Sequence, residues 1–70
     1  MSYTLTDLEL ADRQVAQGTR HVEQQRAIVR GLEARGHDSE EAKKLLVMFE
    51  TTLQNHRRYQ DAIRLGVGHE

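Results

Sequence analysis

The strongest constraint on this chain is a repeat of apolar residues, three and four positions apart, that is interrupted only around Gly36-His37-Asp38. Spacings of three and four residues place side chains on one face of a helix. The chain contains no proline, so nothing forces either stretch to bend or stop. The sequence therefore predicts an all-α fold, a single domain over residues 1–70, in which two helices of about residues 7–35 and 39–64 form an antiparallel hairpin.

Capping residues mark the ends of both predicted helices. Residues 6–9, Thr-Asp-Leu-Glu, fit a capping box in which the Thr6 hydroxyl and the later Glu satisfy free backbone amides. Residues 38–41, Asp-Ser-Glu-Glu, fit a second box. Gly36 follows the first repeat and is the residue type that most readily takes the left-handed conformation at a helix end. The turn should therefore lie at residues 36–38.

The two repeats are predicted to face each other as the hairpin seam. The positions involved are Leu8, Ala11, Val15, Gly18, Val22, Gln25, Val29 and Leu32 in the first helix, and Ala42, Leu46, Phe49, Leu53, His56, Gln60 and Ile63 in the second. A turn near residue 37 pairs Val22 with Leu53 and Gly18 with His56. A glycine there would leave room for the imidazole ring.

Three polar residues, Gln25, His56 and Gln60, occupy seam positions where apolar residues are expected. Buried polar groups that find partners fix the register and the oligomeric state of helical bundles. Alternatively, protonation of His56 in mildly acidic solution would place a charge in the core and make assembly depend on pH. The sequence leaves both roles open.

A second apolar stripe extends beyond the seam. Residues 45–49, Leu-Leu-Val-Met-Phe, are apolar around the whole helix, and one neighbouring helix cannot cover them. We therefore predict that two hairpins associate through a two-fold axis near the turn into a four-helix bundle. The predicted interface residues are Ile28, Gly31, Leu45, Val47, Met48 and Thr52. The alternative is a monomer with an exposed apolar patch.

Residue patterns for catalysis and metal binding are not found. The residues three positions before the four histidines are not glutamates, so the Glu-x-x-His pattern of di-iron bundles is missing. The chain has no cysteine, and its two serines lie near the start and at the predicted start of the second helix. No glycine-rich phosphate loop is present. We expect no enzymatic activity, no metal and no cofactor.

The charge balance argues against nucleic acid and membranes as partners. The formal net charge is −1, and no apolar run exceeds five residues. The first residues lack the basic start and apolar core of a signal peptide, so we expect a cytoplasmic protein. The candidate residues for a basic contact face are Arg13, Arg20, Arg57, Arg58 and Arg64.

A set of residues spread through both predicted helices resembles a group of short helical-hairpin proteins of alphaproteobacteria such as the rhizobia. These residues are His21, Gln25-Arg26, Ile28, Leu32-Glu33, Gly36-His37-Asp38, Ala42, Leu45-Leu46, Phe49-Glu50 and His56-Arg57. The similarity covers roughly residues 14–64. The group has no established activity, so the resemblance implies a bacterial, cytoplasmic protein and assigns no functional residue.

Taken together, these features predict a small interaction or assembly module that forms a homodimer through the stripe near the turn. One alternative is a regulatory protein whose apolar face binds a different signalling or transcription protein. A further alternative is weak nucleic-acid binding through the arginines, which would weaken steeply with salt.

Overall fold

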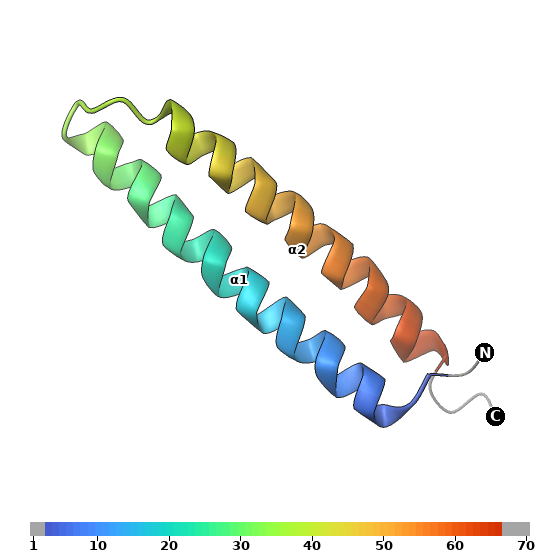
Figure 1. The fold of residues 1–70 in the computed structure, drawn as a ribbon. Coiled ribbons are helices and arrows are strands. Elements are labelled where there is room, and N and C mark those ends of the chain that lie inside the picture. The colour runs from blue at the N-terminus through green and yellow to red at the C-terminus, as the bar shows by residue number, and fades with distance from the viewer. Residues whose placement is uncertain (1–2, 67–70) are drawn as a thin grey trace.

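The chain forms a hairpin of two long helices in a computed structural model that describes residues 3–66. Helix α1 spans Leu5–Ala34 and helix α2 spans Glu40–Gly66. The helices run antiparallel and lie side by side along their whole length, so that the start of α1 and the end of α2 are at the same end of the molecule (Figure 1). The Cα atoms extend over 56 Å along the long axis of the hairpin. The predicted all-α hairpin is confirmed.

Helix α1 begins one half-turn earlier than predicted. The Thr4 hydroxyl accepts a hydrogen bond from the Asp7 amide at 3.2 Å, and the Asp7 carboxylate accepts one from the Thr4 amide at 3.0 Å. The predicted box at Thr6 was therefore wrong, because the same Thr-x-x-acid pattern occurs two residues earlier. The earlier start also brings Tyr3 edge-on to Tyr59, with ring centroids 6.1 Å apart.

The end of α1 confirms the role predicted for Gly36. This glycine has a φ of 70°, in the left-handed region. The His37 amide donates to the Leu32 carbonyl at 2.8 Å, and the Gly36 amide donates to the Glu33 carbonyl at 3.1 Å. These two bonds form a Schellman motif, which satisfies carbonyls that a helix end would otherwise leave free. The chain leaves α1 in a direction that allows α2 to return along it.

Replacing Gly36 with alanine is expected to lower the free energy of unfolding by about 1 kcal/mol. A Cβ at this position would meet no atom within 4 Å, so the loss comes from backbone strain at positive φ alone. Urea denaturation of the Gly36→Ala and Gly36→Asn variants measures it. Asparagine tolerates this conformation better, so equal losses for the two variants would contradict the explanation.

Helix α2 begins with a simpler cap than predicted. The Asp38 carboxylate accepts from the Glu40 amide at 3.0 Å, and the Ser39 carbonyl accepts the first helical bond from the Lys43 amide. The reciprocal bond of a capping box is not among the hydrogen bonds of residues 3–66. The Glu41 carboxylate instead lies 3.3 Å from the Lys44 ammonium, one turn along the helix. Asp38 therefore caps α2 alone.

The hairpin core is a narrow seam between the helices. Its buried apolar residues all belong to the predicted seam and are Ala11, Val22, Val29, Leu53 and Ile63. Gly18 and His56 line the same groove, but the side chain closest to Gly18 is that of Leu53 and not the predicted imidazole. A methyl group on Gly18 would lie 3.1 Å from Leu53 Cδ1. The aliphatic side chain fills the closest approach of the helices, and His56 lies half-buried at the edge of the seam.

Candidate interaction surface

The hairpin has two broad faces, one on each side of the seam, and their compositions are opposite. Residues three and four apart on a helix share a face. One face, here called the charged face, holds Asp12, Ala16, Thr19, Glu23, Arg26, Arg30 and Glu33 of α1 with Lys43, Val47, Glu50, Gln54, Arg57, Asp61 and Arg64 of α2. The other, the uncharged face, holds Leu10, Gln14, Gln17, His21, Gln24, Ile28 and Gly31 of α1 with Leu45, Met48, Thr52, Asn55, His56, Tyr59 and Ala62 of α2.

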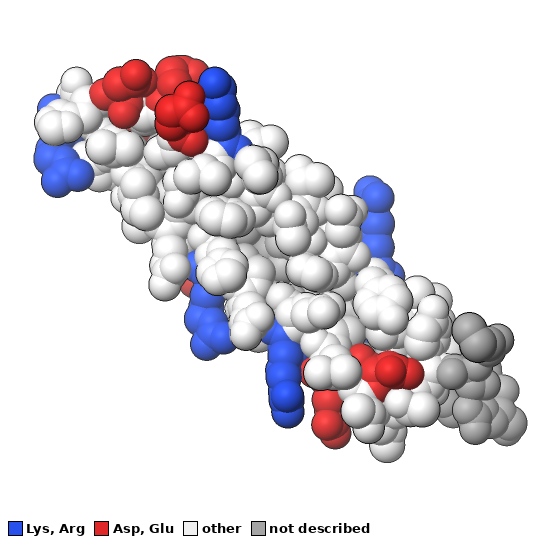
Figure 2. Space-filling model, in the orientation of Figure 1, with Lys and Arg blue, Asp and Glu red and all other residues white. Residues whose placement is uncertain are grey.

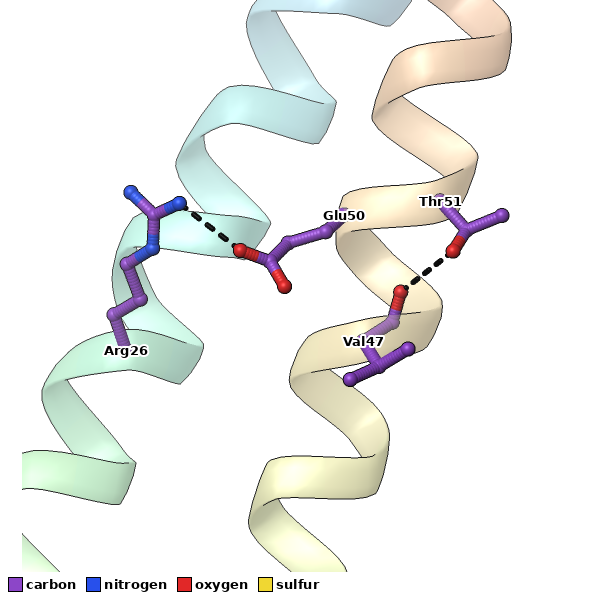
Figure 3. A network of polar contacts seen from close by, with 4 residues as sticks. All are labelled: Arg26, Val47, Glu50 and Thr51. Carbon is purple, nitrogen blue, oxygen red and sulfur yellow. Dashed lines mark hydrogen bonds and ion pairs between the residues drawn. The ribbon is translucent and has the colours of Figure 1, made fainter.

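The charged face carries every ion pair that joins α1 to α2 in the described part of the chain. Arg26 contacts Glu50 at 3.0 Å. Figure 3 shows this ion pair between the two helices. The other two pairs are Lys43 with Glu33 at 3.1 Å and Arg64 with Asp12 at 3.6 Å. All these side chains are largely exposed, so each pair contributes little to stability. Together they leave this face with its charges matched internally.

One of these ion pairs, Lys43 with Glu33, shifts the pKa of its lysine. The hydrogen bond and the negative charge of Glu33 raise the pKa of Lys43 above its ordinary value. Lysine is charged below its pKa, so the pair contributes fully at neutral pH. On the alkaline side, its contribution is lost as the pH rises through the raised pKa of Lys43, in strongly alkaline solution. The register that this pair supports near the turn is therefore insensitive to physiological pH.

The uncharged face is hollowed along its middle. A groove of about 430 Å³ runs between the helices there and has no charged residue in its lining, which consists of Gln14, Gln17, Gly18, His21, Met48, Phe49, Thr52 and His56. The His21 ring is tilted against the Phe49 ring with centroids 5.7 Å apart. Figure 2 shows uncharged side chains over the middle of the molecule, with acidic groups near its ends and basic groups at its edges.

Large apolar side chains stand exposed on the uncharged face on both sides of this groove. Toward the turn they are Ile28, Leu45 and Met48, and toward the open end they are Leu10 and Tyr59; each is at least 44% exposed. Exposed apolar side chains that continue along one face, rather than scattered singly, mark an interaction site. The stripe predicted near the turn is therefore part of a longer surface that follows the whole hairpin.

The structure places the predicted interface residues on two different faces. Ile28, Gly31, Leu45, Met48 and Thr52 lie on the uncharged face. Val47 lies on the charged face, in a groove with Arg26, Glu50 and Arg57, and its carbonyl accepts a bond from the Thr51 hydroxyl (Figure 3). Val47 is thus separated from the other five predicted interface residues, because each residue turns a helix by about 100° and neighbours in sequence reach opposite sides of the seam.

Sequence reasoning also missed much of the uncharged face. The polar residues Gln14, Gln17, Gln24 and Asn55 belong to it and were not predicted as interface residues. Their signal is present in the sequence, as an uncharged strip with spacings of four and three from Leu10 to Gly31. It is found only by searching for missing charges rather than for apolar residues.

The three polar seam residues differ in their burial and in their hydrogen-bond partners. Gln25 is buried, as predicted, and its side-chain amide donates to the Ala42 carbonyl across the hairpin at 2.9 Å. Gln60 is half-buried and donates to the Asp12 carboxylate at 2.6 Å. His56 is half-buried and lines the groove of the uncharged face. Only Gln25 is enclosed by the single hairpin, so it is the polar residue that specifies the register of the two helices.

The five arginines considered as a basic face do not gather on one side. Arg57 and Arg64 lie on the charged face among acidic residues, where Arg64 reaches Asp12. Arg13 and Arg20 share the outer edge of α1, and Arg58 occupies the outer edge of α2, as their helical positions require. No continuous basic groove results, so the arrangement gives no support to nucleic-acid binding.

The described residues were also searched for a metal site and for a membrane-spanning helix. Within residues 3–66, no three acidic or histidine side chains converge on a point that a metal ion could occupy. Neither α1 nor α2 has a sufficiently long and apolar stretch for a membrane crossing. Comparisons of the chain with protein-family models, curated proteins and solved structures gave no match.

Proposed function

We propose that this protein is a small, non-enzymatic assembly module that pairs with a second copy through the uncharged face, forming an antiparallel four-helix bundle. One observation carries the proposal. All ion pairs between the described parts of α1 and α2 lie on the charged face, and the uncharged face bears exposed Ile28, Leu45 and Met48. Cores of four-helix bundles are built from such inward faces, and their solvent faces carry the charges.

The chemistry of the uncharged face favours a second copy over a different protein. A two-fold axis brings a surface against itself, so a fixed charge close to the axis meets its own copy. Its two strips hold no Asp, Glu, Lys or Arg from Leu10 to Gly31 and from Leu45 to Ala62. Charged residues continue the strips only at their ends, and they are Asp7, Arg35, Glu41 and Lys44. The uncharged face is instead rich in Gln and Asn, whose amides both donate and accept hydrogen bonds and so can pair with identical groups. The face is therefore compatible with its own copy.

The size of the face and of the core also supports pairing. A strip about 56 Å long and two helices wide, each about 10 Å across, has room for the roughly 800 Å² per partner of a standard interface. The single hairpin buries few apolar side chains, and the chain has no cysteine for a disulfide. Scaffolds with so small a core usually rely on such bonds, on metals or on oligomerisation.

Sedimentation equilibrium of the full chain over a dilution series tests the proposal, with helicity recorded by circular dichroism on the same samples. We expect twice the chain mass of 8.1 kDa and strong helicity at micromolar concentration. A chain that is monomeric at every concentration, with a helicity that does not change on dilution, would contradict self-association. It would instead favour a different protein as the partner of the uncharged face.

A further inference from the structure

Two histidines lie in the groove at the centre of the uncharged face. His21 is near the middle of α1 and His56 is near the middle of α2. Both line the groove, where His21 is exposed and His56 is half-buried. Of the other two histidines, His37 is in the turn, and His69 lies outside the described residues. Among residues 3–66, the uncharged face therefore has two imidazoles, both central.

No acidic group faces either imidazole. The α2 residues that share the groove with His21 are Met48, Phe49, Thr52 and His56. From α1, His56 is faced by Gln14, Gln17 and Gly18, and the titratable group one turn along its own helix is Tyr59. Arg20, Arg57 and Arg58, the sequence neighbours, belong to other sides of their helices. A proton taken up by either histidine therefore finds no negative partner within the face.

We infer that His21 and His56 make the assembly a pH-controlled one, in which protonation separates the two copies. The inference rests on the proposed pairing through the uncharged face. Two faces that overlap along their full length have coincident centres, whether the two-fold axis runs along or across the hairpins. Both orientations bring four imidazoles into one central, uncharged layer of the bundle.

The sign of the effect follows from burial. A dimer takes the imidazoles out of water, which disfavours their charged form, and places up to four like charges near one another. The separated hairpins leave both histidines in contact with solvent. Protons therefore bind more readily to the monomer, and the dimer weakens as the pH falls through the range in which histidine takes up a proton. The tilted contact of His21 with Phe49 exists within one hairpin and so is common to both states.

The test is the dissociation constant of the dimer between pH 7.5 and 5.5, measured by analytical ultracentrifugation at constant ionic strength in the presence of EDTA. The slope of log Kd against pH gives the number of protons taken up on dissociation. We expect Kd to rise by about 100-fold over this range, equivalent to one proton per dimer, or half a proton per hairpin, averaged over the two pH units. The variant with both His21→Gln and His56→Gln is expected to change by less than about threefold.

Matched variants separate the possible results. His37→Gln removes an imidazole outside the groove and should keep the full pH dependence, and each single variant, His21→Gln or His56→Gln, should keep about half the slope. The single variants provide a second measurement if the double variant pairs poorly. A wild-type dimer with a flat Kd, or a double variant that keeps the full slope, overturns the switch and leaves the proposed pairing standing. A chain that is monomeric at pH 7.5 overturns both.

Discussion

Replacing Met48 with aspartate is expected to convert the proposed dimer into monomers at low micromolar concentration. Met48 lines the groove of the uncharged face and is 62% exposed in the single hairpin. At pH 7.5, pairing would bury two new carboxylates, one from each copy, in a groove whose lining contains no Lys or Arg. An unpaired buried charge costs at least about 3 kcal/mol, which corresponds to a rise in Kd of about 100-fold.

The adjacent residue provides the control. Val47 is exposed to nearly the same degree, at 60%, but it lies on the charged face in a groove that also contains Arg26 and Arg57. Val47→Asp should therefore leave the mass unchanged in sedimentation equilibrium. A Met48→Asp protein that stays dimeric, or a Val47→Asp protein that dissociates equally, would show that the interface has been assigned to the wrong face. Circular dichroism should be recorded for both variants to confirm that the helices remain.

The second large effect is expected in the seam. Leu53 is buried at the closest approach of the helices, where its Cδ1 occupies the space that Gly18 leaves. Leu53→Ala removes this contact and opens a cavity, which typically costs roughly 2–5 kcal/mol. A small domain is stable by only about 5 kcal/mol or somewhat more. We therefore expect Leu53→Ala to lose most of its cooperative thermal unfolding transition.

Two further variants identify the cause of that loss. Leu65 is 74% exposed, so Leu65→Ala makes the same chemical change outside the core and should cost less than about 0.5 kcal/mol. Adding Gly18→Ala to Leu53→Ala places a methyl group in the emptied space and improves helix propensity, which should recover about 1 kcal/mol. The same Gly18→Ala change in the wild type crowds Leu53. If Gly18→Ala acts identically in both backgrounds, Leu53 does not pack on Gly18 as described.

The corrected predictions share a physical origin. Two threonines, Thr4 and Thr6, have equally suitable acids three residues later, and local capping cannot choose between them. The packing of Tyr3 against Tyr59, from the other end of the chain, accompanies the choice of Thr4. In the seam, a leucine and a histidine one helical turn apart could each be opposite Gly18. The axial offset of the helices decides between them.

The assignment of residues to the two faces of the hairpin was the least predictable property. Val47 and Met48 are adjacent, apolar and similarly exposed. They lie on opposite faces only because the centre of the seam runs between them. A displacement of that centre by one residue rotates a helix by about 100° and exchanges the residues of its two flanks. The uncharged strip is visible in the sequence, but its position beside a groove and opposite the ion pairs depends on how both helices are rotated.

By itself, the sequence determined the two helices, the turn at residues 36–38, the left-handed conformation of Gly36 and most of the buried seam. These features depend on side chains at most a few positions apart and on apolar spacing, which act before any long-range contact forms. Only the tertiary structure decided that Leu53 meets Gly18, that Val47 and Met48 belong to opposite faces, and that the arginines spread over several sides. Each of these depends on the relative rotation and axial offset of α1 and α2, which are set by packing between residues far apart in the chain.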